Sequence, residues 1–306
     1  MSEGLPPAVE IEYEPRFCGN HVVDLTAGCS FSCIYCPFAD RGASRRGVSR
    51  PTPLRLLAPE RLPAPASVFL SPASDAFAPQ AAAATHELLG HLLPRGTIVG
   101  IVTKGIIPER TLDLLERHRD QVEGIAIGVT SLDDARNRIL EPGCPAAGER
   151  LANIARIARR GLPSALRIDP LFPLLDDDRV ALESLVDEAA RRGAIAITAT
   201  YVFAWGPYLR RLRQEPLLEE ACALLTEKTP MEGGLAFSVP LARKLGTYSW
   251  LAQTATARRL GFTTCGCKDL RMRDVATFPT TCRNITLLGD RSCPATPTGG
   301  SREPAG

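Results

Sequence analysis

The sequence predicts an α/β protein built on a parallel sheet. Short apolar segments recur along the first two thirds of the chain, and segments of helical length separate them. Strands that read as continuous apolar runs are typical of a sheet buried on both faces. The strand candidates are 21–26, 67–71, 98–104, 124–131, 165–169 and 194–203. The helix candidates are 79–93, 108–119, 146–160 and 177–192.

Local signals mark where several of these helices begin and end. Pro108-Glu-Arg is typical of a first helical turn, and the two Arg-Arg-Gly runs that end at Gly161 and Gly193 are typical of helix ends. The first crossover is the weakest unit, because its basic stretch 41–65 has no clear pattern and is predicted to be mostly loop. Functional sites in such folds lie where the parallel strands end at their carboxyl edge.

Three cysteines follow the first strand at C-x3-C-x2-C spacing. Cys29, Cys33 and Cys36 fall within eight residues. Three thiolates in one short loop can hold three irons of a [4Fe-4S] cluster and leave the fourth iron open for another ligand. The alternatives are a zinc site or three unrelated thiols. Zinc sites usually show two Cys or Cys/His pairs, and no fourth ligand stands nearby in the sequence.

The cysteine spacing resembles the radical S-adenosylmethionine (SAM) superfamily, and Tyr35 before the third cysteine also fits its pattern. The resemblance implies a partial (β/α)6 radical SAM barrel, followed here by a C-terminal cysteine-containing extension. It implies that the open iron binds SAM and that the reduced cluster cleaves SAM to methionine and a 5'-deoxyadenosyl radical. It also implies a reductant partner such as flavodoxin or ferredoxin.

Residues at the ends of the next strands are similar to the spore photoproduct lyase-like (DNA repair photolyase-like) branch. The matching pieces are Ser74-Asp75, Thr103-Lys104, Ser131, Glu141-Pro142 and Arg150-Leu151. By this resemblance Ser74, Asp75, Lys104 and Ser131 contact SAM, and Tyr35 is the catalytic candidate. Ordinary turn and capping chemistry is the alternative for the short polar residues. A strand-end lysine is harder to explain structurally, because lysine is rarely buried without a partner.

Two departures from that branch count against thymine-dimer reversal. The family places a hydrogen-donating cysteine just before the Ser-Asp pair, where this chain has 69–73 without a cysteine. The family also places a tyrosine after the third cluster cysteine, where this chain has Pro37. We therefore expect the radical-initiating half of the chemistry without the family's Cys-Tyr hydrogen relay.

A second cysteine group lies in the C-terminal third. Its members are Cys265, Cys267, Cys282 and Cys293. Four such ligands can hold a second [4Fe-4S] cluster or a structural zinc, and unligated thiols are the remaining alternative. The predicted organisation is an N-terminal extension (1–16), the barrel (17–228), an extension with the auxiliary cluster (229–293) and a disordered tail (294–306).

Composition excludes some classes of protein. The formal net charge of +2 does not by itself indicate a nucleic-acid partner, but it does not exclude one. The start of the chain lacks the pattern of a signal peptide, and no apolar run approaches the roughly 18 residues of a membrane span. We expect a cytoplasmic protein that does not contact membranes, in which many of the ten cysteines ligate metal rather than form disulfides.

Three functional classes follow. The first is an enzyme that abstracts hydrogen from a nucleic-acid base, nucleotide or nucleoside-like substrate, with an arginine-rich loop to grip phosphate. The second is a tailoring enzyme for a peptide or small natural product, whose auxiliary cluster transfers electrons, binds substrate or donates sulfur. The third is a non-enzymatic iron-sulfur or zinc protein. The loop arginines are Arg41, Arg45, Arg46, Arg50 and Arg55.

Overall fold

The structure is a computed structural model that describes residues 12–17, 20–23, 25–26, 28–38, 67–71, 74–231, 234–274 and 280–281. The arginine-rich loop, Cys282, Cys293 and the predicted tail lie outside the described residues.

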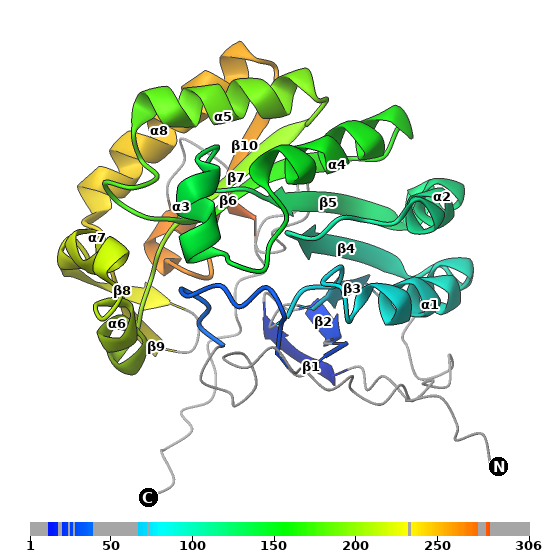
Figure 1. Ribbon diagram of the computed structural model, residues 1–306, viewed down its shortest axis with the longest axis horizontal. Coiled ribbons are helices and arrows are strands. Elements are labelled where there is room, and N and C mark those ends of the chain that lie inside the picture. The colour runs from blue at the N-terminus through cyan, green and yellow to red at the C-terminus, as the bar shows by residue number, and fades with distance from the viewer. Residues whose placement is uncertain are drawn as a thin grey trace, which may run out of the picture.

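A twisted, largely parallel sheet forms the centre of the molecule (Figure 1). In the described part of the chain its strands are, in spatial order, β1 (Glu12–Phe17), β2 (Asn20–Val23), β3 (Ser67–Leu70), β4 (Ile98–Thr103), β5 (Val122–Gly128), β6 (Ser164–Leu171), β7 (Ala196–Tyr201), β10 (Gly261–Cys265) and β11 (Thr280–Thr281). All neighbours pair in parallel except β1 with β2. The six predicted strands correspond to β2 through β7, so the predicted fold class is confirmed.

Most of the helices lie along the outer face of this curved sheet (Figure 1). The four predicted helices are α1 (Ala82–Leu92), α2 (Glu109–Arg117), α4 (Ala147–Arg159) and α5 (Arg179–Arg191). Four more that the sequence analysis did not predict are α3 (Asp134–Leu140), α6 (Gly206–Leu212), α7 (Glu219–Ala223) and α8 (Leu241–Ala257). Helices α1, α2, α4, α5 and α8 lie along the outer face, whereas α6 and α7 lie beside the small hairpin of residues 227–238 (Figure 1). Gly161 and Gly193 follow α4 and α5 with φ angles of 66° and 89°. Glycine adopts this left-handed conformation without strain, which explains the helix ends.

Apolar side chains from neighbouring strands form one core with the helices. Ile101, Ile125 and Ile197 of β4, β5 and β7 are fully buried, as are Leu115 of α2 and Ile154 of α4. Burial of this continuous apolar layer supplies most of the stabilisation of such a fold. It also holds the carboxyl ends of the parallel strands at one common edge.

The chain after residue 228 continues the sheet. The antiparallel hairpin β8 (Glu227–Met231) and β9 (Gly234–Ser238) leads into α8, and β10 then pairs in parallel with β7, with Phe262 opposite Ile197. This added strand brings residues of the predicted extension to the same sheet edge as the cysteine loop. Among the described helices, none combines the length and the apolar character that crossing a membrane requires.

Candidate active site

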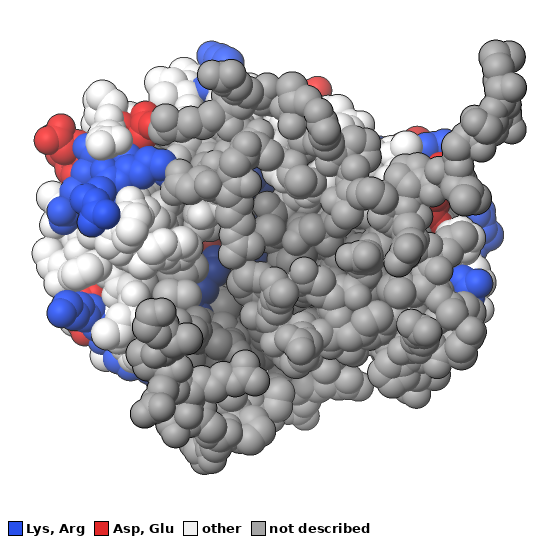
Figure 2. Space-filling model, turned by 90° about the horizontal axis from the view of Figure 1, so that it is seen from below, with Lys and Arg blue, Asp and Glu red and all other residues white. Residues whose placement is uncertain are grey.

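A cavity of about 460 Å³ opens at the carboxyl edge of the sheet. It is lined by strand ends from β3 to β10 and by the loop that follows β2. Figure 2 views the molecule from below, and basic side chains are visible inside a hollow on this face. Aromatic and apolar side chains make up much of the wall, among them Phe31, Phe69, Phe203, Trp205 and Met231.

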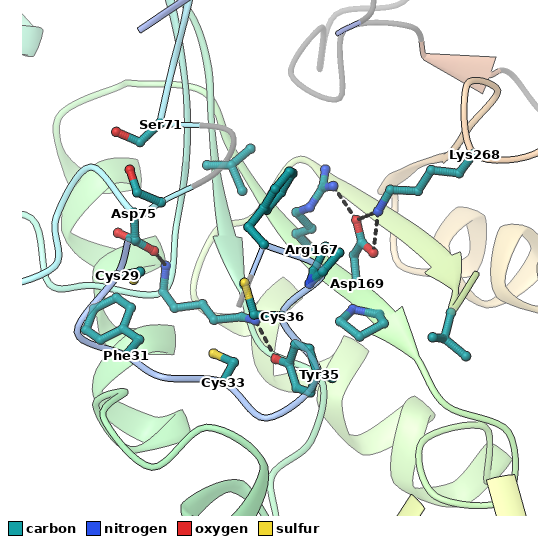
Figure 3. Close-up of a pocket in the computed structure, with 18 of the residues that line it drawn as sticks. Cys29, Phe31, Cys33, Tyr35, Cys36, Ser71, Asp75, Arg167, Asp169 and Lys268 are labelled. Carbon is teal, nitrogen blue, oxygen red and sulfur yellow. Dashed lines mark hydrogen bonds and ion pairs between the residues drawn. The ribbon is translucent and has the colours of Figure 1, made fainter. Parts of the chain in front are cut away.

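The three motif cysteines line this cavity together, as predicted. Cys29, Cys33 and Cys36 are each half-buried on the loop after β2 (Figure 3). Within the described residues, no three His, Cys, Asp or Glu side chains converge as the ligands of one metal ion do. Three soft thiols around open cavity space fit the ligand chemistry of an iron-sulfur cluster, which is larger than a single ion.

The segment after α3 holds the cysteine loop by its backbone. The Ile34 amide donates to the Leu140 carbonyl at 2.9 Å, and the Gly143 amide donates to the Phe31 carbonyl at 3.0 Å. A Cβ at position 143 would lie 2.8 Å from the Phe31 Cα and closer still to the Ser30 carbonyl oxygen. Only glycine therefore allows the two segments to approach this closely.

We expect Gly143→Ala to displace the cysteine loop and to lower the iron content after anaerobic reconstitution. Overpacking of this kind typically lowers the free energy of unfolding by about 1–3 kcal/mol. The matched control is Gly148→Ala on α4, where nothing lies within 4 Å of the new Cβ. That control should keep its iron, and its free energy of unfolding should rise by up to about 1 kcal/mol, because alanine favours the helix more than glycine does. Equal iron content in the two variants would contradict the proposed role of Gly143.

Tyr35 is buried and its hydroxyl joins a charged network beneath the loop. Lys104 Nζ donates to the Tyr35 hydroxyl at 2.5 Å, and the hydroxyl donates to Glu141. Burial and the negative charge of Glu141 raise the pKa of Tyr35 well above its usual value. Tyr35 is therefore a neutral hydrogen-bonded phenol at the edge of the cavity, and its catalytic role stays a prediction.

Glu141 is the centre of that network. It lies 3.1 Å from Lys104 Nζ and 2.6 Å from Arg150 Nη1, and the side chains of Glu141 and Arg150 are fully buried. Burial alone would raise the pKa of Glu141, but the two cations outweigh it and lower the pKa to about 2. Lys104 thus has structural partners, contrary to the expectation that its position is hard to explain structurally.

The other predicted SAM contacts divide into two groups. Ser74, Asp75 and Lys104 line the cavity with the cysteines. The Asp75 carboxylate accepts hydrogen bonds from Phe77 N, Thr103 Oγ1 and Lys104 N, at 2.9, 2.6 and 2.7 Å, so it also ties the β3 loop to the end of β4.

Ser131 lies elsewhere, in the turn that starts α3. Its hydroxyl accepts from the Asp133 amide at 2.9 Å, and its carbonyl accepts from Asn137 Nδ2 at 2.9 Å. It is not among the residues that line the cavity. This is the turn chemistry that the sequence analysis kept as the alternative.

The second cysteine group reaches the same cavity. Cys265 ends β10, Cys267 follows it, and both are buried in the cavity wall. None of the described cysteines forms a disulfide bond. Their shared cavity depends on the pairing of β10 with β7, a strand that the sequence analysis did not predict.

Several functional candidates were missed from the sequence. Arg167 and Asp169 on β6 and Lys268 after β10 form an ion cluster that lines the cavity (Figure 3). Their signal was the charged pair inside the apolar strand candidate 165–169. Cys144 was not missed: it lies in a Pro/Gly loop that the sequence analysis expected to be able to reach the site, and its Sγ lies 4.0 Å from Cys33 Sγ. Arg211 is buried and donates to the Cys36 carbonyl.

Comparison with known proteins identifies the class. The Radical SAM superfamily matches residues 23–186. This is more than half of the chain, so the chain belongs to the radical SAM superfamily. It is a radical SAM enzyme, a class whose cofactors are a [4Fe-4S] cluster and SAM.

Among curated proteins, an uncharacterized protein of Mycobacterium tuberculosis is 32% identical over 112 residues, which are 36% of this chain and 33% of the relative. An uncharacterized protein of Acidianus two-tailed virus is 28% identical over 129 residues, 41% of this chain and 42% of the relative. The chain thus spans less than half of the length of these curated relatives.

Among solved structures, a tyrosine-to-phenylalanine mutant of spore photoproduct lyase matches with a TM-score of 0.63 and 17% identity, covering 83% of this chain and 78% of that one. Spore photoproduct lyase complexed with dinucleoside spore photoproduct matches with a TM-score of 0.60 and 18% identity, covering 83% and 77%. At these identities the similarity demonstrates a shared fold, and it confirms the resemblance of fold predicted from the motifs.

Proposed function

We propose that Cys29, Cys33 and Cys36 hold the SAM-binding [4Fe-4S] cluster, and that the enzyme abstracts hydrogen from a nucleic-acid base, nucleotide or nucleoside-like substrate. The observation that carries the proposal is a single cavity that combines the three thiols with aromatic walls and a cationic cluster. When bound, such a cluster would supply the electron that splits SAM into methionine and the 5'-deoxyadenosyl radical, and that radical would remove the hydrogen atom. The electron comes from a reductant such as flavodoxin or ferredoxin, in a cytoplasmic setting.

The chain's own residues supply binding and orientation. Ser74, Asp75 and Lys104 stand beside the cysteines, and we assign them to SAM. Short hydroxyls and an ammonium group can bond the polar groups of the methionyl and ribose parts. Ser131 contributes indirectly by shaping the start of α3.

The aromatic walls support a substrate with a flat ring. Phe203 and Trp205 lie with ring centroids 6.4 Å apart, and Trp205 and Tyr208 with centroids 5.1 Å apart. Aromatic side chains stack on nucleobases of any sequence. Spore photoproduct lyase, which shares the fold, has been solved in complex with dinucleoside spore photoproduct, and this supports a nucleotide-like substrate.

The residues that line the cavity do not favour thymine-dimer reversal. Phe69 and Ser71 line the cavity in the segment where the family's hydrogen-donating cysteine would stand, and Pro37 lines it in place of the tyrosine. None of these side chains is a thiol or a phenol, so none of them can return a hydrogen atom as that relay does.

Deuterium transfer tests the proposal. The reconstituted enzyme, reduced with dithionite, should form 5'-deoxyadenosine from SAM, and a deuterated nucleotide or oligonucleotide should pass deuterium into that product. Mass spectrometry measures the label. Cleavage of SAM without label from any nucleoside, nucleotide or oligonucleotide would remove the proposed substrate class.

The second candidate is a tailoring enzyme for a peptide or small natural product with an auxiliary cluster. The position of Cys265 and Cys267 in the cavity wall favours it. In this case the reconstituted enzyme should hold about eight irons per chain, and a Cys265→Ala/Cys267→Ala variant about four. One zinc in place of the second cluster would make the site structural, and an unchanged iron count would leave the two cysteines unligated.

A further inference from the structure

The ion cluster of Arg167, Asp169 and Lys268 on the cavity wall carries more positive than negative charge. Lys268 Nζ lies 2.7 and 2.5 Å from the two carboxylate oxygens of Asp169, and Arg167 Nη2 donates to one of them. Figure 3 shows the three side chains converging. One carboxylate balances one cation, so the group of three has a net charge of +1.

Arg167 has donor capacity that its neighbours do not use. Its residue is 9% exposed, and its Nη1 has no hydrogen-bond partner among the described residues. Buried donors in native proteins are nearly always satisfied, so an unpartnered one calls for an explanation. Because Arg167 lines the cavity, a ligand in the cavity is the natural acceptor.

The second cation of the cavity differs from this cluster. Lys104 lies 3.1 Å from the buried carboxylate of Glu141, and its ammonium group also contacts Tyr35. Glu141 also pairs with Arg150, so that group of three has the same surplus charge, but Arg150 is fully buried and the Lys104 ammonium already contacts both Glu141 and Tyr35. Arg167 and Lys268 form a second cationic group in the cavity, where Lys268 Nζ also lies 5.1 Å from the ring centroid of Phe203.

We infer that Arg167 and Lys268 form an anion subsite that binds the phosphate of the substrate while its base lies against the aromatic wall. This inference rests on the proposed function and names the substrate more narrowly, as a nucleotide rather than a nucleoside. The arginine fork matches phosphate oxygens in pairs, and lysine adds a point charge. Asp169 holds both cations in place, so it is a positioning residue.

Binding of matched ligands tests the subsite. Anaerobic calorimetry on the reconstituted, SAM-bound enzyme compares each of the four deoxynucleoside 5'-monophosphates with its deoxynucleoside. We expect at least one monophosphate to bind about tenfold to hundredfold more tightly than its nucleoside, the range that a charge-assisted hydrogen bond provides. Lys268→Gln and Arg167→Gln should each remove most of this preference.

The matched control is Lys228→Gln on β8, which removes one positive charge from an exposed lysine outside the cavity lining. It should keep the wild-type preference. Lys268→Gln is less prone to misfold than Arg167→Gln, because the Lys268 side chain is 22% exposed. Melting curves and iron content accompany each measurement.

The other outcomes overturn the subsite in distinguishable ways. Equal affinity for nucleotide and nucleoside refutes the subsite and leaves the proposed substrate class in place. No binding of either ligand refutes both. Weaker SAM binding in the variants, with the nucleotide preference unchanged, assigns the cations to SAM. Loss of iron in the variants, with the preference for nucleotide over nucleoside unchanged, assigns the two cations to a cluster.

Discussion

Replacing Cys29, Cys33 and Cys36 together with alanine should abolish the cleavage of SAM. The three thiols line one cavity on one loop, and the cluster of a radical SAM enzyme needs all three to hold its irons. The reconstituted variant, reduced with dithionite, should form no 5'-deoxyadenosine above background and should lose about four irons per chain. Liquid chromatography and iron analysis measure the two results.

The control for this variant is Cys222→Ala. Cys222 is a buried thiol on α7 that does not line the cavity. Its removal should leave SAM cleavage and iron content unchanged. A triple variant that still formed 5'-deoxyadenosine would contradict the assignment of the cluster. Iron that persists in the triple variant would point to the second cysteine group instead.

The sequence was sufficient to predict the strands from β2 to β7, because the signals in that part of the chain are local. Runs such as 98–104 and 124–131 are apolar over their whole length, and Gly161 and Gly193 mark helix ends by a conformation that glycine favours. By contrast the sequence of β10 is Gly-Phe-Thr-Thr-Cys, and both of its threonines form hydrogen bonds with the neighbouring strand β7. Such a polar strand gives no clear apolar signal. It joins the sheet by pairing with β7, which is far from it in the sequence.

The candidate site shows the same limit. The close spacing of the three cysteines was enough to predict that they lie together, because they occupy one short loop. The network of Tyr35, Lys104, Glu141 and Arg150 joins residues from four separate segments, and no pattern of spacing reveals such contacts. Position at a strand end led to the prediction of both Lys104 and Ser131 as SAM contacts. In the structure Lys104 lines the cavity, whereas the turn into α3 holds Ser131.

Arg150→Met should destabilise the protein strongly. The Arg150 guanidinium is fully buried, contacts Glu141 Oε2 at 2.6 Å and donates to the Gly128 carbonyl at 2.9 Å. Removing one partner of a buried ion pair typically costs about 3–5 kcal/mol, because the other charge stays buried without full compensation. We expect the melting temperature to fall by roughly 10 °C. Arg159→Met on the same helix is the control, and its exposed side chain should matter little.

The same variant should also weaken cluster binding, because the network supports the cysteine loop. Glu141 accepts from Tyr35, which lies between Cys33 and Cys36 on that loop, and Lys104 bridges the two. Iron content should therefore fall in Arg150→Met even at temperatures where the variant is folded by circular dichroism. A double variant, Arg150→Met with Glu141→Gln, removes both buried charges. Its loss of stability should be smaller than the sum of the two single losses, because each single change leaves a charge that the double change also removes. Strict additivity would mean that the two residues stabilise the fold independently, and that the carboxylate does not link the barrel helix to the cysteine loop.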